Sequence, residues 1–295
     1  MTEKLLLRVA TPRWLWVPAT LALILLAGPL IALTILAPWG SLPAILGDPE
    51  VLTSLRLSLG TAAISTIISL LLGLPLAVLL HRLSGVARAV LYGFLVIPLV
   101  LSPVVSGLAL LYFWGRRGLL GTLLENLGVQ VGFSPVAVVL VQVFVALPFF
   151  VIAALGSFEG VDPDLELAGA NAGANATQIL RYITLPLALP GILGGTLLAF
   201  ARALGEYGAT ITFAGSVEGR TRTLPLQIEL ALNSNQPDQA LGIALMLIAM
   251  YIMVVVISAW ALRTVVSRSV VSRGTGVPAQ PLLASRSTAS APGRG

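Results

Sequence analysis

The sequence contains no cysteine, only one histidine and few charged residues. The lack of cysteine excludes disulfides, thiol catalysis and cysteine metal sites. The single histidine, His81, argues against a histidine-based metal or catalytic cluster. Charged residues make up 10% of the 295 positions, against roughly 25% in a typical soluble domain. Because so few polar groups cannot cover a folded surface in water, we expect lipid to be the solvent of this chain.

Long apolar stretches take the place of the missing charges: 57% of the residues are hydrophobic and the mean hydropathy is +0.98. Six charge-free stretches each supply the ~20 residues that a helix needs to cross a bilayer. The first follows three basic residues, as a signal peptide would, but it exceeds the ~7–15 apolar residues of a signal sequence, so we expect it to remain as an anchor. The sequence therefore predicts an all-α integral membrane protein with spans at about 16–36, 58–80, 90–114, 136–155, 187–209 and 241–262.

The distribution of Lys and Arg predicts the orientation, because cytoplasmic segments carry an excess of positive charge. With a cytoplasmic N-terminus, eleven of the 17 Lys and Arg residues fall on the inner side, five fall on the outer side, and Arg202 lies within the membrane. His81 and Arg82 are interpreted as an inner-side anchor. Because the basic residues are scattered between apolar blocks, no nucleic-acid partner is expected. The predicted divisions are a cytoplasmic N-terminus at 1–13, a six-span membrane domain at 14–262 and a disordered cytoplasmic tail at 263–295.

The connection at 159–186 is the most informative part of the inner side. Asp162 or Asp164 can cap a helix there, with Pro163 in its first turn. Small residues then recur at helical spacing, at Ala168, Gly169, Ala172, Gly173 and Ala176. They would let another protein approach the backbone closely, or they would ease packing against the membrane helices. The spacing alone leaves both readings open.

This connection resembles the cytoplasmic loop of permease subunits of ABC importers. That loop reads Glu-Ala-Ala, three residues, Gly, nine residues, then Ile-x-Leu-Pro. Downstream of Gly173 the match is in register, and upstream Glu166 stands one position early. The residues that carry the motif are Glu166, Leu167, Ala168, Gly169, Gly173, Ile183, Leu185 and Pro186.

The resemblance implies that the loop forms a coupling helix that docks on a separate ATP-binding subunit. The chain has no Gly-x-x-x-x-Gly-Lys-Ser/Thr phosphate loop. We therefore expect a transport subunit that is not itself an enzyme, with no catalytic residue, metal or cofactor of its own. ATP and magnesium would be bound by a pair of partner ATPase subunits.

The stretch "ARALGEYGAT", at 201–210, places two charges in an apolar segment. Arg202 and Glu206 are four residues apart, so they lie on one helix face and can pair. If the span enters near Leu187, Arg202 lies roughly 22 Å above the inner side and Glu206 nearly 30 Å above it. The pair could hold helices together, or Arg202 could line an anion path while Glu206 fixes its rotamer.

Four further residues are candidates for a transport path. Thr210 and Thr212 could offer hydroxyl donors just beyond Glu206, or they could be ordinary polar residues of the membrane interface. Pro98 and Pro103 in the third span free backbone carbonyls and kink the helix. Such kinks shape a cavity in some membrane proteins and serve only packing in others.

The segment "ARALGEYGATITFAG" with the following "TRTLPLQIELAL" resembles molybdate and sulfate permeases, and is more similar to the molybdate branch. The resemblance implies a type I ABC importer permease in the inner or plasma membrane that moves molybdate or the chemically similar tungstate. Sulfate or thiosulfate is the alternative. It also implies a periplasmic or extracellular binding protein that selects the anion, and a homodimer whose third and fifth spans, with Gly191, Gly194 and Gly195, line or close the path. A secondary carrier or channel would lack the loop motif and would transport without an ATPase. A membrane-embedded enzyme would need a catalytic set such as paired carboxylates or histidines near the interface, and the sequence shows none.

Overall fold

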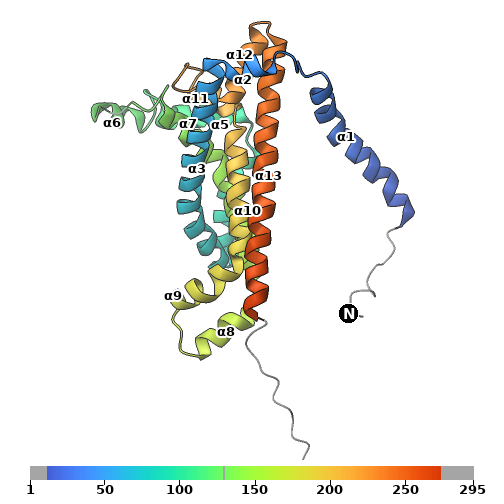
Figure 1. Cartoon of the computed structure of the whole chain (residues 1–295). Helices are drawn as coiled ribbons and strands as arrows, with labels where there is room; N and C mark the ends of the chain where they lie inside the picture. Colours follow the sequence, from blue (N-terminus) through green and yellow to red (C-terminus); the bar gives the residue numbers. More distant parts are fainter. Residues whose placement is uncertain (1–11, 129, 274–295) are drawn as a thin grey trace, which may run out of the picture.

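The computed structural model describes residues 12–128 and 130–273, with side chains at most positions up to 259. Every regular element among these residues is a helix (Figure 1). The elements are η2 (Arg13–Leu15), α1 (Trp16–Ile35), α2 (Leu42–Gly47), α3 (Pro49–Arg82), α4 (Gly85–Val100), α5 (Pro103–Trp114), α6 (Gly121–Asn126), α7 (Pro135–Glu159), α8 (Pro163–Asn171), α9 (Ala176–Ile179), η3 (Leu180–Thr184), α10 (Leu185–Leu204), α11 (Gly208–Phe213), α12 (Leu224–Asn233) and α13 (Pro237–Arg273).

Five stretches of helix among the described residues are long and apolar enough to cross a membrane. They are η2 with α1, α3, α7, α9 to α10, and α13. The pair α4 and α5 makes a sixth if it is taken as one broken span, bent by 113°. The all-α polytopic architecture expected from the sequence is therefore present.

The third span differs from the predicted continuous helix at 90–114. The chain runs helically through Pro98 and then leaves the helix at Leu101 and Ser102, whose ψ angles are 138° and 148°. A residue that precedes proline disfavours the helical region, and Ser102, which precedes Pro103, is extended. The Ser102 hydroxyl then caps α5 by accepting the N–H of Val105 at 3.3 Å.

The last helix is longer than predicted. α13 continues to Arg273, whereas the disordered tail was expected from residue 263. Residues 263–273 contain neither proline nor glycine, and Gly274 is the first helix breaker. The rest of the predicted tail, 274–295, and most of the predicted N-terminal segment, 1–11, lie outside the described residues.

The core of the bundle is formed by α3, α7 and α10, with α13 alongside α10 (Figure 1). Glycines permit the close approach of these helices, as is common where lipid replaces water. A Cβ added at Gly73 of α3 would lie 2.5 Å from the ring of Phe150 on α7, and one at Gly195 of α10 would lie 3.0 Å from Ala153. Phe150 is completely buried between these contacts.

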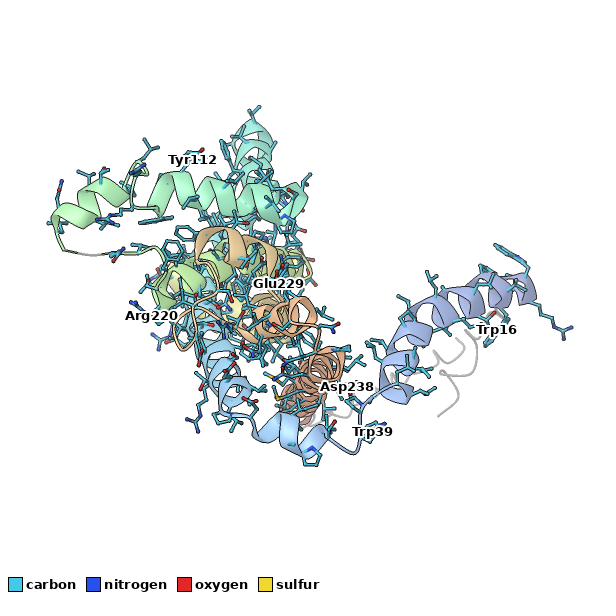
Figure 2. All side chains as sticks on the ribbon, turned by 90° about the horizontal axis from the view of Figure 1, so that it is seen from above. Trp16, Trp39, Tyr112, Arg220, Glu229 and Asp238 are labelled. Carbon is cyan, nitrogen blue, oxygen red and sulfur yellow. The ribbon has the colours of Figure 1, made fainter. Side chains whose placement is uncertain are left out.

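The two ends of the bundle carry different elements. α8, α9 and the end of α13 lie at one end, and α2 and α12 lie at the other (Figure 1). The first helix, α1, stands apart from the bundle and has no buried residue. Figure 2 shows α1 with Trp16 on one side of the molecule and Tyr112 of α5 on the opposite side. The apolar surface of α1 is thus not covered by the other described residues, 36–128 and 130–273.

Candidate functional site

The 159–186 connection folds into two short helices at one end of the bundle. Asp162 begins α8, accepting the N–H of Asp164 at 3.0 Å, and Pro163 occupies the first turn. α9 begins with a capping box, in which Asn175 and Gln178 bond each other's backbone N–H at 3.0 and 2.8 Å. Both starts follow from local sequence. Asp162, rather than Asp164, is the capping residue.

Gly173 forms the turn between α8 and α9. Its φ is +87°, and the N–H of Ala174 bonds the carbonyl of Gly169 at 3.1 Å. A left-handed residue just beyond a helix end is usually glycine, because a Cβ is strained there. A Cβ added at Gly173 would meet no atom within 4 Å. In the structure the glycine is therefore required by the backbone angle of the turn.

Glu166 is the point where three elements meet. Its carboxylate accepts two bonds from the guanidinium of Arg82, the last residue of α3, at 2.9 and 3.1 Å. The hydroxyl of Thr184, at the end of η3, donates to Glu166 Oε1. Burial is the largest influence on the pKa of Glu166 and acts to raise it, but the bonds from Thr184 and Arg82 together outweigh burial and lower the pKa.

Besides the bond between Glu166 and Thr184, the two halves of the loop motif also touch at Gly169 and Ile183. A Cβ added at Gly169 of α8 would lie 2.6 Å from Cδ1 of Ile183. Ile183 belongs to η3, a single π-helical turn that leads into α10 through Leu185 and Pro186. Leu165 and Leu167, the residues before and after Glu166 on α8, are 44% and 59% exposed, and Ala168 is exposed as well.

A groove of about 610 Å³ separates α8 from α9 and the end of α3. Its walls are mostly apolar, with the Arg82–Glu166 ion pair as the charged part. The lining residues are Val78, Arg82, Pro163, Glu166, Leu167, Ala170, Ala176, Thr177, Ile179 and Leu180.

Arg202 and Glu206 pair as expected, but not on one continuous helix. α10 ends at Leu204 and α11 begins at Gly208, so the predicted span to 209 is interrupted and Glu206 lies in the gap. Nη1 of Arg202 is 2.7 Å from Oε2 of Glu206. Oε1 of Glu206 accepts the N–H of Ala209 at 2.9 Å. The carboxylate therefore also caps α11, a role that local sequence did not reveal.

The two charged groups differ in exposure. The Glu206 side chain is 2% exposed and that of Arg202 is 30% exposed. The guanidinium carbon of Arg202 lies 5.9 Å from the ring centre of Phe149 on α7, a cation–π contact. The site thus holds a buried carboxylate behind a cation that reaches the surface of this chain.

The interruptions in the two broken spans pack against each other. A Cβ at Gly208, the first residue of α11, would lie 2.5 Å from Cβ of Pro103, the first residue of α5. A Cβ at Gly107 would lie 2.6 Å from Cβ of Thr212. On the other side, a Cβ at Gly205 would collide with the hydroxyl of Tyr251 from α13.

The remaining path candidates are placed differently. Thr210 is fully buried, and its hydroxyl has no hydrogen-bond partner among the described residues. The hydroxyl of Thr212 donates to the carbonyl of Gly208 at 2.9 Å. Pro98 lines an apolar cavity of about 380 Å³ between α4, α5 and α7. Of the six candidates, Arg202, Glu206 and Pro103 lie at the junction of the breaks, whereas Pro98 lines a separate cavity.

The outward face of α10 connects Arg202 with open surface. Gly194 and Leu198 precede Arg202 at intervals of four residues, so the three lie on one helix face. Leu198 is exposed, and a Cβ at Gly194 would meet nothing within 4 Å. Gly191 and Gly195 pack instead against Ser157 and Ala153 of α7. Gly191 and Gly195 thus face α7 and Gly194 does not, and the expectation that the three glycines line or close a path stays a prediction.

No metal centre is built by this part of the molecule. Among residues 12–128 and 130–273, no three His, Asp or Glu side chains are grouped so that they could hold a metal ion. The partners that the sequence reasoning missed are Arg82, Thr184, Phe149 and Tyr251. Arg82 is 84 residues from Glu166 in sequence, and no local pattern links the two.

Comparisons with known proteins agree with this architecture. A family model described as "Binding-protein-dependent transport system inner membrane component" matches residues 69–271. The molybdenum transport system permease protein of Mycobacterium tuberculosis is 45% identical over 244 residues, which cover 83% of this chain and 92% of the relative. The sulfate transport system permease protein of Synechococcus elongatus is 35% identical over 202 residues, covering 68% of this chain and 71% of the relative.

The fold is also found in solved structures. A bacterial alginate ABC transporter, solved in complex with its alginate-bound periplasmic protein, superposes with a TM-score of 0.67. The match covers 83% of this chain and 91% of that chain at 16% identity, so it supports the fold alone.

Proposed function

Because this chain belongs to the family of binding-protein-dependent transport system inner membrane components, we propose that it is the permease subunit of an ATP-driven importer of molybdate. The observation that carries the choice of anion is the 45% identity, over 83% of the chain, to a molybdenum transport permease. Tungstate has the same tetrahedral shape and charge, so it is expected to share the path.

The Arg202–Glu206 junction supports an anionic substrate. A charge at membrane depth is costly unless it faces a cavity or a partner. Glu206 is fully covered and engages one end of the guanidinium, whereas Arg202 remains partly exposed on the outward face of α10. A guanidinium carries five N–H donors, so Arg202 can keep its bond to Glu206 while other donors meet an oxyanion. Positive potential of this kind lowers the cost of moving a dianion through a medium of low dielectric constant.

A second copy of the chain would complete the path. The face of α10 with Gly194, Leu198 and Arg202 is open, and α1 has no buried residue. Two such faces brought together around a two-fold axis would enclose a path with Arg202 from each copy at its wall. We therefore propose a homodimer.

The two ends of the bundle offer places for the remaining partners of this proposal. A pair of ATPase subunits, which bind ATP and magnesium, would dock at the end with α8, where Leu165 and Leu167 are exposed. This chain would bind no cofactor and perform no hydrolysis itself. A periplasmic or extracellular binding protein would deliver the anion to the opposite end, near α2 and α12. Both termini would then be cytoplasmic and the protein would lie in the inner membrane.

Sulfate is the second candidate, because a sulfate permease is 35% identical over 68% of the chain. The test is uptake into proteoliposomes that contain the permease, its ATPase and its binding protein, with molybdate, tungstate and sulfate compared at equal concentration. We expect ATP-dependent molybdate and tungstate uptake, with sulfate taken up weakly. Preferred sulfate uptake would overturn the choice of anion, and uptake by the permease without its ATPase would indicate a secondary carrier.

A further inference from the structure

We propose that Glu166 is a positioning residue that fastens the coupling helix α8 to α3 and α10, and that its charge is directed into the permease instead of toward the ATPase. This inference rests on the proposed function, because it takes α8 as the helix on which the ATPase docks. It assigns to Arg82 and Thr184 a role in coupling that the sequence motif does not contain.

The first support is the convergence of three elements on one carboxylate. Arg82 Nη1 and Nη2 donate to Glu166 Oε2 and Oε1 at 2.9 and 3.1 Å, and the Thr184 hydroxyl also donates to Oε1. The two parallel guanidinium bonds fix the direction as well as the distance. Both oxygens of Glu166 are therefore engaged inside the permease.

The second support is the exposure of the groups around this ion pair. The Glu166 side chain is 18% exposed and Thr184 is fully buried. Leu165 and Leu167, the two neighbours of Glu166, are among the exposed large apolar residues of this chain. Since α8 lies at the end of the bundle and beyond the predicted spans, lipid would not cover these leucines, and a docked ATPase would. We therefore take Leu165 and Leu167, the second of which lines the groove beside α8, as the apolar surface left for the ATPase.

The third support is that α10 connects the Glu166 contact at one end with Arg202 at the other. Thr184 is the N-cap residue of α10, and Arg202 lies in the last turn of the same helix. A 20-residue helix is a rod about 30 Å long. A displacement of α8 would therefore be passed through Glu166 and Thr184 to the inner end of α10, and along α10 to the junction that holds Arg202. Arg82 passes the same displacement to α3.

The experiment uses the complete complex in proteoliposomes with its ATPase and binding protein. The variants are Glu166→Gln, Arg82→Gln, Thr184→Val and the swap Arg82→Glu with Glu166→Arg. Three quantities are measured: the affinity of the ATPase for the permease, ATP hydrolysis stimulated by the loaded binding protein, and molybdate transported per ATP hydrolysed.

We expect the three single variants to bind the ATPase as the wild type does. Molybdate transported per ATP should fall by about fivefold or more in Glu166→Gln and Arg82→Gln, and by less in Thr184→Val. The swap should restore most of the ratio, because it recreates the ion pair with reversed polarity. A merely structural role would change the yield of complex but not this ratio.

The opposite assignment gives a different pattern. If Glu166 contacts the ATPase directly, Glu166→Gln weakens ATPase binding, Arg82→Gln does not, and the swap restores nothing; this result would overturn the proposal. If the swap does not assemble, Thr184→Val decides, because it changes no charge: an unchanged transport ratio would count against the proposal.

Arg88→Gln is the matched control. Arg88 pairs with Glu159 at the same end of the bundle, but that ion pair joins α4 to the end of α7. Its removal takes away one positive charge, as Arg82→Gln does, without touching α8, and the transport ratio should stay at the wild-type value. A wild-type complex that moves no oxyanion would refute the proposed function, which is distinguishable from a failure of the Glu166 assignment.

Discussion

Arg202 lies in the last turn of α10 and Glu206 lies beyond the end of that helix, and yet Nη1 of Arg202 and Oε2 of Glu206 are only 2.7 Å apart. The helix α10 stops at Leu204, so the pair bridges a gap and does not brace a continuous helix. The same carboxylate caps α11 through the N–H of Ala209. Glu206 thus both pairs with Arg202 and caps α11, and substitutions can separate these two roles.

We expect Glu206→Gln to assemble and Glu206→Ala to be less stable. The glutamine retains an acceptor for the Ala209 N–H, whereas the alanine leaves that buried group unpaired at a cost of about 1–3 kcal/mol. Both variants leave Arg202 without its ionic partner, so both should hold the anion more tightly and release it more slowly. Thermal unfolding of the purified complex reports the first effect, and lower KM with lower maximal uptake reports the second.

The swap of Arg202→Glu with Glu206→Arg tests whether Arg202 meets the anion. The swapped pair keeps the attraction but places a carboxylate on the outward face of α10, where it would repel a dianion. We expect complex to form, with some loss of stability because arginine cannot cap α11, and uptake to be poor. Uptake near the wild-type level by an assembled swap variant would limit the pair to holding the helices.

Gly173→Ala should destabilise the turn after α8 by about 1–2 kcal/mol, because a Cβ is strained at a φ of +87°. Gly156→Ala is the matched control: it also has open space at the Cβ position, but it lies inside α7 without a positive φ. There alanine should be neutral or stabilising. Protease cleavage between α8 and α9 measures the difference, and equal cleavage in both variants would contradict the backbone explanation.

The Glu166 contacts predict a pH dependence. The pKa of Glu166 is lowered in the folded chain from an ordinary value of 4.5. A lowered folded-state pKa contributes stability that is present above the unfolded-state value and is lost as the pH falls through the folded-state value. We therefore expect the attachment of α8 to be constant at neutral pH and to weaken only below about pH 4.5. Amide exchange in α8 measures this, and Glu166→Gln should remove the acid-dependent step.

A cysteine at position 198 should crosslink two copies of the chain, whereas one at position 199 should not. Leu198 is exposed on the outward face of α10, and Ala199 is fully buried against the bundle. The natural chain has no cysteine, so each variant contains a single thiol. Oxidation in membranes followed by non-reducing electrophoresis gives the result. Absence of the 198 dimer in an active complex would argue against α10 at the two-fold interface.

The sequence predicts the membrane architecture well, because a bilayer imposes length and charge rules that are read locally. The breaks were harder to predict. Pro98 and Pro103 look alike in sequence, but α4 continues through Pro98 and ends three residues before Pro103. Prolines are tolerated within membrane helices when neighbours satisfy the freed backbone groups. Which proline interrupts the span therefore depends on tertiary contacts, here on α11 packed beside Pro103.

The candidate site was predicted only in part. The Arg202–Glu206 pair follows from a spacing of four residues, and Glu166 was found because it stands beside a motif. Its partners were not found. Arg82 looks like any inner-side basic residue, and Thr184 looks like any residue at a helix start; only the fold brings them to one carboxylate.

The contact between Pro103 and Gly208 has a mechanical consequence. The first residues of α5 and α11 are so close that no side chain fits at position 208, so we expect these two segments to move together. Residues 101–102 and 205–207 connect this pair of segments to α4 and α10, so we expect a rotation at one connection to require a rotation at the other. Gly208→Ala would force the two segments apart. We therefore expect this single substitution to restrict movement at both connections at once.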